Sequence, residues 1–298
     1  MLTEYVCECG KGVYRLKYKT PYTSDCRYTW LHPKVFVRIS LLVAACLLAT
    51  GSQAEQSNHW IDEDKFKFTI GTFITNYDTE FRLTSSTLGR GTNISFEDDL
   101  GLEESNEVVR LDGHYRFSPR HRLEFSYFDL SRDGKIVTTR PIIIDDTLFR
   151  EGSALSTKFD YRVLKLAYAY SFWQTEKFDL SASGGLYTFD VDIQVKSTDG
   201  KQEGDAGTAP FPMFGLHLDY RFTKAVYFST SFEYFVIDKD DFEGELTDAR
   251  IGIEYRPFEN IGFGLGYNVA TIFAEDTGSD DEFHFEYDGI LVYISWNH

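Results

Sequence analysis

From residue 65 to the end of the chain, apolar and polar residues alternate one by one. In the segment 109–117, the odd positions are apolar or aromatic apart from Gly113, whereas the even positions hold Arg, Asp, His and Arg. Successive side chains of a β-strand point to opposite faces, so this segment predicts a strand with one apolar and one charged face. The same alternation recurs to the C-terminus and predicts an all-β protein.

Turn signals divide this region into ten predicted strands. These cover residues 65–77, 106–117, 121–132, 157–172, 177–193, 211–222, 225–238, 246–256, 261–274 and 283–296. Short turns alternate with longer connections, which are expected around residues 78–105, 133–156, 194–210, 239–245 and 275–282. Eight or twelve strands are the alternatives. Apparent changes of register near Val163 and at Gly184-Gly185 predict β-bulges.

The alternation allows two architectures, which differ in what covers the apolar face. In a water-soluble sandwich this face packs against a second sheet, whereas in an outer-membrane barrel it meets lipid and the polar face lines the lumen. Short turns on one side and long loops on the other favour the barrel. No window reaches the 18 apolar residues of a membrane-spanning helix, which excludes a helical membrane protein. We therefore expect a monomeric, transmembrane, antiparallel up-and-down β-barrel.

The N-terminal part of the chain differs in composition from the predicted barrel. Residues 31–54 are typical of a secretory signal peptide, with a basic start, an apolar stretch at 39–49 and a small-residue cleavage site ending at Ala54. A lipoprotein-type cleavage before Cys46 is the alternative. Residues 1–30 are expected to result from a start site placed too far upstream; a real N-terminal extension is the alternative. Residues 55–64 would then form a short periplasmic segment before a barrel covering 65–298.

Composition narrows the classes of function. The chain has 298 residues and carries 47 acidic against 30 basic residues, a net charge of −17, which argues against a nucleic-acid partner. Aromatic residues make up 16% of it, too many for a disordered chain. All four cysteines precede residue 47, so the predicted barrel has no disulfide.

Three segments carry a resemblance to a known class of proteins. The C-terminal segment looks like the assembly signal of bacterial barrels, although its last residue is His rather than the usual Phe; its key residues are Gly289, Tyr293, Ile294, Trp296 and His298. With the stretch Gly91–Leu102 and the segment 110–117, the chain resembles bacterial outer-membrane β-barrel proteins, in particular a proteobacterial group without an assigned activity. This resemblance implies the outer membrane of a Gram-negative bacterium, contact with lipid and lipopolysaccharide, and recognition by the barrel assembly machinery.

The predicted polar face is rich in ionisable groups. It holds Arg110, Asp112, His114, Arg116, Arg122, Glu124, Lys165, Asp179, His217, Asp219, Arg221, Glu233, Arg250, Glu254 and Arg256. Buried charges must be paired or hydrated, and a ten-stranded barrel is barely wider than one that side chains fill. We therefore expect a lumen closed by salt bridges, in a protein with a structural role. A narrow pore that makes it a minor solute channel is the alternative.

An enzyme is the second class of function, acting on lipid A or as a hydrolase. The candidates are a Ser–His pair of His114 with Ser126, and the Asp-x-Asp of Asp190 and Asp192, which is similar to outer-membrane aspartyl-type proteases but lacks their partner Asp-x-His. Neither signal is specific. Acidic loops at 97–99, 238–245 and 275–282 are candidate sites for divalent cations that bridge to lipopolysaccharide, or are simply a solvated anionic surface. Apart from these surface loops, no cofactor or metal site is predicted.

Overall fold

The computed structural model describes residues 65–85, 90–144, 147–239, 241–279 and 281–298. The predictions for residues 1–30, 31–54 and 55–64 fall outside this part of the chain and stay predictions. In the described part, no helix is long and apolar enough to cross a membrane.

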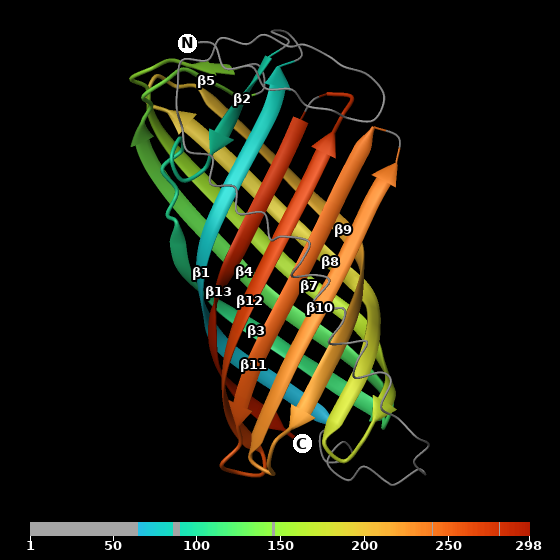
Figure 1. The fold of residues 1–298 in the computed structure, drawn as a ribbon. Helices are drawn as coiled ribbons and strands as arrows, with labels where there is room; N and C mark the ends of the chain where they lie inside the picture. Colours follow the sequence, from blue (N-terminus) through green and yellow to red (C-terminus); the bar gives the residue numbers. More distant parts are fainter. Residues whose placement is uncertain (1–64, 86–89, 145–146, 240, 280) are drawn as a thin grey trace, which may run out of the picture. The chain divides into compact units, whose positions relative to one another are not determined.

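Ten long antiparallel strands form a closed barrel, which confirms the predicted fold class and strand number (Figure 1). They are β1 (Phe66–Ser85), β3 (Ser105–Ser118), β4 (His121–Val137), β7 (Ala154–Gln174), β8 (Phe178–Ser197), β9 (Gln202–Arg221), β10 (Val226–Lys239), β11 (Phe242–Tyr255), β12 (Ile261–Asp276) and β13 (Asp281–Asn297). Each strand pairs with its neighbours in the chain, and β13 closes the barrel by pairing with β1. All ten predicted strands are present.

The two ends of the barrel differ in their connections. One end, here called the short-turn end, carries the four tight turns together with residue 65 and the C-terminus (Figure 1). The other, the long-loop end, also carries β2 (Arg90–Ser95), which pairs with β1, and a hairpin of β5 (Ile142–Ile144) and β6 (Thr147–Phe149). Strands reach further toward this end than predicted, so that the expected long connection at 194–210 is a turn at residues 198–201.

Apolar side chains cover the outside of the short-turn half of the barrel and form what we call the apolar belt. On β13 alone, Ile290, Val292, Ile294 and Trp296 are 47–52% exposed. The other strands contribute further exposed apolar residues, among them Ile70, Leu123, Leu164, Leu166, Phe214, Leu216, Ile251, Ile253, Phe263 and Leu265. These are the outward positions of the predicted alternation.

Part of the way along each strand, the outward positions change from apolar to polar and the inward positions change from polar to apolar. On β7, Leu164 and Leu166 point outward within the belt, but further toward the long-loop end the exposed side chains are charged and the buried ones are Phe159 and Tyr161. Pairing of β7 with β8 is continuous through Val163, so the predicted bulges near Val163 and at Gly184-Gly185 are wrong. The surroundings of each face change at this level, not the register. The irregularities lie beside short turns, at residues 116–118 and 171–173.

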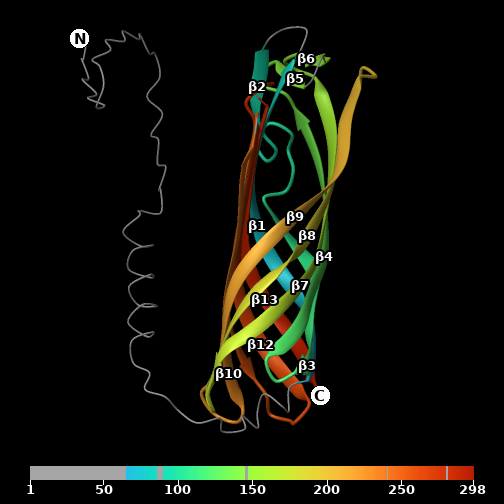
Figure 2. The same cartoon turned by 90° about the vertical axis from the view of Figure 1, so that its right-hand side faces the viewer.

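Aromatic side chains therefore fill the long-loop half, and we call this filling the aromatic layer. Its fully buried members include Phe73, Phe159, Tyr161 and Phe285, with ring centroids of Tyr161 and Phe285 only 4.9 Å apart. Residues 94–102, here called the plug segment, turn into this layer and bury apolar side chains there. The β5–β6 hairpin packs over the same end, as Figure 2 shows.

Candidate functional site

Charged side chains fill the interior of the short-turn half, directly beneath the aromatic layer, and we call them the polar layer. Inward positions of every long strand contribute to it, because the alternation that places apolar groups in the belt turns the intervening residues inward. A cavity of about 150 Å³ lies among these side chains. It is the site with the richest chemistry in the described part of the chain.

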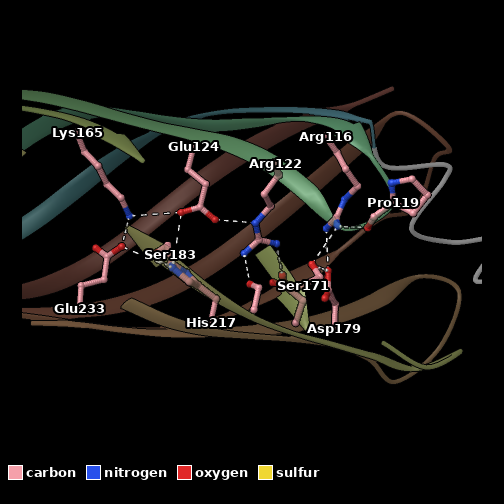
Figure 3. A network of polar contacts seen from close by, with 12 residues as sticks. Arg116, Pro119, Arg122, Glu124, Lys165, Ser171, Asp179, Ser183, His217 and Glu233 are labelled. Atoms are coloured by element: carbon pink, nitrogen blue, oxygen red, sulfur yellow. Dashed lines mark hydrogen bonds and ion pairs between the residues drawn. The ribbon is translucent and has the colours of Figure 1, made fainter. Parts of the chain in front are cut away.

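A compact cluster occupies the middle of the polar layer (Figure 3). The Lys165 ammonium on β7 donates a hydrogen bond to Glu233 on β10 and lies 3.6 Å from a Glu124 oxygen on β4. The Nε2 atom of His217 on β9 is 3.7 Å from oxygens of both carboxylates and 2.7 Å from Ser183 Oγ. Four strands thus place two carboxylates around one ammonium and one imidazole, all buried or nearly so.

Two arginines extend this cluster toward the short-turn end (Figure 3). Arg122 donates to Glu124 at 2.6 Å, to Asp219 at 2.8 Å and to Ser181 at 3.1 Å. Closer to the short-turn end, Arg116 donates to Asp179 at 2.9 Å and to the Pro119 carbonyl at 2.8 Å. The result is a chain of ion pairs running along one wall of the lumen.

A second set of pairs links β3 and β1 to β11. Asp112 accepts from Arg110 at 3.1 Å and from Arg250 at 3.0 Å, so that strands on opposite sides of the barrel share one carboxylate. Nearer the short-turn end, Glu254 accepts from Lys67 and from Arg256, each at 2.6 Å. These contacts link strands across the barrel, and the paired acids and bases leave the net charge of the polar layer close to zero.

Fourteen of the fifteen predicted lumen residues line or contact the polar layer, and one lies apart. Arg221 is at the short-turn end, where it donates to the Glu176 carbonyl at 3.3 Å. The prediction missed several inward residues, namely Lys67, Tyr187, Asp248, Asn268 and Tyr293. Asp248 lies two positions before Arg250 on the same strand face, so extending the alternation by one step would have found it.

The central cluster has the composition of a metal site but already contains a positively charged side chain. One ligand atom each from Glu124, His217 and Glu233 lie within 4.8 Å of one another. The Lys165 ammonium bonds to Glu233 among them and supplies the positive charge that a cation would bring. A metal ion would have to displace that ammonium, so the arrangement is best described as an ion-pair cluster.

The same cluster lacks the geometry for nucleophilic catalysis. Ser183 and the two carboxylates all approach the Nε2 atom of His217, whereas a catalytic triad places the carboxylate on the other ring nitrogen. The predicted Ser126 is 5% exposed and lines the cavity in the lumen, away from the outer surface. Asp190 points outward and pairs with Arg162 at 3.0 Å, on an open face rather than in a cleft.

Ion pairs also hold the plug segment in place. The Arg132 side chain is fully buried and donates to Glu97 at 2.6 Å and to Thr79 at 2.8 Å, with its guanidinium 4.6 Å from the centre of the Tyr77 ring. At the surface, Arg140 donates to Asp99, and this hydrogen bond raises the pKa of Arg140. Two acids of the predicted loop 97–99 are therefore paired with arginines of the same chain.

The predicted assembly segment forms the closing strand. Ile294 and Trp296 point outward into the belt and Tyr293 points inward, while the backbone of His298 exchanges hydrogen bonds with Phe66 on β1 at 2.8 Å. Gly289 lies against β1, where a Cβ atom would meet the Thr75 Cα at 2.9 Å. The segment thus completes the seal between the first and last strands.

A comparison with solved structures finds β-barrels of the bacterial outer membrane. The structure is similar to the outer membrane protease OmpT of Escherichia coli, with a TM-score of 0.53 and 10% identity, over 79% of this chain and 97% of that one. It is also similar to the transport unit of the autotransporter AIDA-I of Escherichia coli (TM-score 0.42, 7% identity, 88% and 97% covered) and to the attachment invasion locus protein Ail of Yersinia pestis (0.35, 11%, 77% and 99%). No family model matches the sequence. A search of curated proteins finds no match either. The chain has the fold of bacterial outer-membrane β-barrel proteins.

Proposed function

We propose that this protein spans the bacterial outer membrane as a barrel with a sealed lumen, and that its role there is structural. The apolar belt supports the membrane location, since an exposed apolar band on a closed barrel is what hydrocarbon would cover. The long-loop half, charged outside and aromatic inside, would stand clear of the hydrocarbon on the outer side. Lipid and lipopolysaccharide are the partners that this placement implies.

The observation that carries the sealed lumen is the stacking of two filled layers along the barrel axis. A passing solute would have to separate ion pairs such as Arg122–Glu124 at 2.6 Å and then displace the aromatic layer and the plug segment. Separating paired buried charges is costly because each is left without compensation. The 150 Å³ cavity is the feature that favours the alternative, a minor solute channel.

Three further parts of the proposal concern partners. The closing strand β13 would be the part recognised during barrel assembly. The acidic segments at 238–245 and 275–282 would bind divalent cations that bridge to lipopolysaccharide phosphates, since carboxylate oxygens are ligands that such cations prefer. A monomer fits the closed β1–β13 pairing, which leaves no long strand edge at that junction for a second copy.

Single-channel recording tests the sealed lumen. The full chain, refolded into a planar lipid bilayer at 0.1 V in molar KCl, should give no stepwise openings beyond those of a protein-free bilayer. Insertion is checked separately by the slower electrophoretic migration of unfolded relative to folded barrel. Stepwise conductance from inserted protein would overturn the structural role in favour of the channel.

The enzymatic alternative has a different readout. Mass spectra of lipid A and phospholipids from cells with and without the protein should be the same, because the described lumen carries no complete catalytic arrangement that reaches the outer surface. A new or missing acyl group in the spectra would replace the structural role by a lipid-modifying one.

A further inference from the structure

Pairing between β9 and β10 stops half way along the barrel. In the described parts of these strands, it runs from Tyr227–Arg221 to Tyr234–Phe214 and goes no further. Beyond that level β9 continues to pair with β8, and β10 continues to pair with β11. We call this unpaired junction, between β9 residues 202–213 and β10 residues 235–239, the seam; the two strands diverge there in Figure 2.

The local sequence explains why the pairing ends. Pro210 and Pro212 lie just beyond Phe214, and a proline has no N–H to donate to a neighbouring strand. Pairing of β9 with β8 runs past both prolines without a shift in register. The missing N–H donors therefore lie on the side of β9 that faces β10. Two N–H groups on this unpaired edge would be unsatisfied next to hydrocarbon, and the prolines remove them.

The lower part of the seam lies at the level of the apolar belt. Pro212 is opposite Leu186, which is 46% exposed, and Phe214 and Val236 flank the seam at 68% and 56% exposed. The belt ends slightly higher, where Asp190 pairs with Arg162 on the outer face. The seam therefore begins inside the belt and extends beyond it.

Two aromatic rings close the seam where the backbone does not. The ring centroids of Phe211 on β9 and Phe235 on β10 are 5.8 Å apart, and both side chains are only partly buried. Behind them, the ring centroids of Phe211 and Phe189 are 5.6 Å apart, and the ring of Phe189 stacks on that of Tyr187. The Tyr187 hydroxyl donates to Glu233 in the polar layer. A continuous row of rings thus leads from the outside of the belt to the junction of the two layers.

From this geometry we propose that the seam is a lateral opening for a hydrocarbon chain of the surrounding lipid, gated by Phe211 and Phe235. The proposal rests on the membrane location proposed above, because the occupant is identified by the belt in which the seam begins. Rotation of two side chains opens it, with no hydrogen bonds between strands to break. At the level of the belt, a peptide strand is the less suitable occupant, since Pro210 and Pro212 withhold donors that strand addition uses.

Photo-crosslinking tests this inference. The full chain is refolded into phosphatidylcholine vesicles that contain a phospholipid with a diazirine at the end of one acyl chain, and labelled peptides are identified by mass spectrometry. Outward residues Ile290 and Val292 on the far wall report insertion. If they remain unlabelled, the membrane location has failed; if they are labelled, the results at the seam decide the lateral opening alone.

In the wild-type chain, Phe211 and Phe235 should be labelled, whereas Phe283, which packs against the same aromatic layer on β13, should not. Removing the gate with Phe235→Ala should increase labelling of the buried Met213 and Phe189 several-fold, and the matched Phe283→Ala should not. Labelling of belt residues without Phe211 and Phe235 would overturn the proposal, even if the variant failed to fold. Equal interior labelling in the two variants would overturn it as well.

Discussion

The contribution of the polar layer to stability can be measured at Arg122. This side chain is 4% exposed and bonds to Glu124 and Asp219 at 2.6 and 2.8 Å. Removing one partner of a buried ion pair costs about 3–5 kcal/mol, because the other charge stays buried without compensation. In Arg122→Met, Glu124 would keep Lys165 at 3.6 Å and Asp219 is 34% exposed, so we expect the lower end, about 3 kcal/mol.

Arg162 provides a matched control on the outer face. It also bonds to two carboxylates, those of Asp129 at 3.3 Å and Asp190 at 3.0 Å, but it is 51% exposed. Exposed pairs contribute about 0–1 kcal/mol, so Arg162→Met should change the free energy of unfolding by less than about 1 kcal/mol. Both variants are unfolded with urea in lipid vesicles and followed by tryptophan fluorescence.

A third variant separates charge from packing. Adding Glu124→Gln to Arg122→Met removes the carboxylate that was left without its main partner, and should recover part of the lost stability. If Arg122→Met and Arg162→Met have equal free energies of unfolding, the polar layer is hydrated rather than ion-paired, and the reasoning for a sealed lumen fails with it.

Two further substitutions test the exterior and the closing strand by the same unfolding assay. Leu265→Arg, in the belt, should cost about 2–4 kcal/mol, whereas Asn76→Arg, outward but beyond the belt, should cost less than about 1 kcal/mol; equal costs would mean that hydrocarbon does not cover the belt. Gly289→Ala places a Cβ 2.9 Å from the Thr75 Cα and should cost about 1–3 kcal/mol. Gly207→Ala, with open space around its Cβ, should be close to neutral, and similar values for the two glycines would contradict the close approach of β13 to β1.

The features that the sequence predicts well are those set by local alternation. A strand face is determined by the parity of a residue, so the segment 109–117 alone indicates which of its side chains point outward, and the same parity places Arg122, Glu124 and Glu233 inside. Turn residues divide the alternation into strands, and this was sufficient to obtain ten of them. The pairing partner across the lumen, such as Arg250 for Asp112, required the closed structure.

Other features depend on contacts between distant parts of the chain and leave no local signal. Arg132 is the last residue of the predicted strand 121–132 and was not among the predicted lumen residues, yet it is fully buried because the plug segment brings Glu97 to it. The pair Pro210 and Pro212 lay at the edge of a predicted loop, where prolines are ordinary. Their effect on β10 becomes visible only when β9 is known to continue past them to Gln202.

The exchange of the apolar and polar faces near Val163 connects these observations. Within the belt the outer face is apolar, and the inner face is polar and held by ion pairs; beyond the belt the outer face is charged, and the inner face is aromatic and held by burial. The register of β7 and β8 does not shift there, and Arg162 and Asp190, which are opposite each other, mark the change at the same level on both strands. That level is where the polar and aromatic layers meet, and where Phe211 and Phe235 replace backbone pairing. The proposed lateral opening lies at this junction, and it is compatible with a sealed axial route because each layer blocks that route by a different kind of interaction.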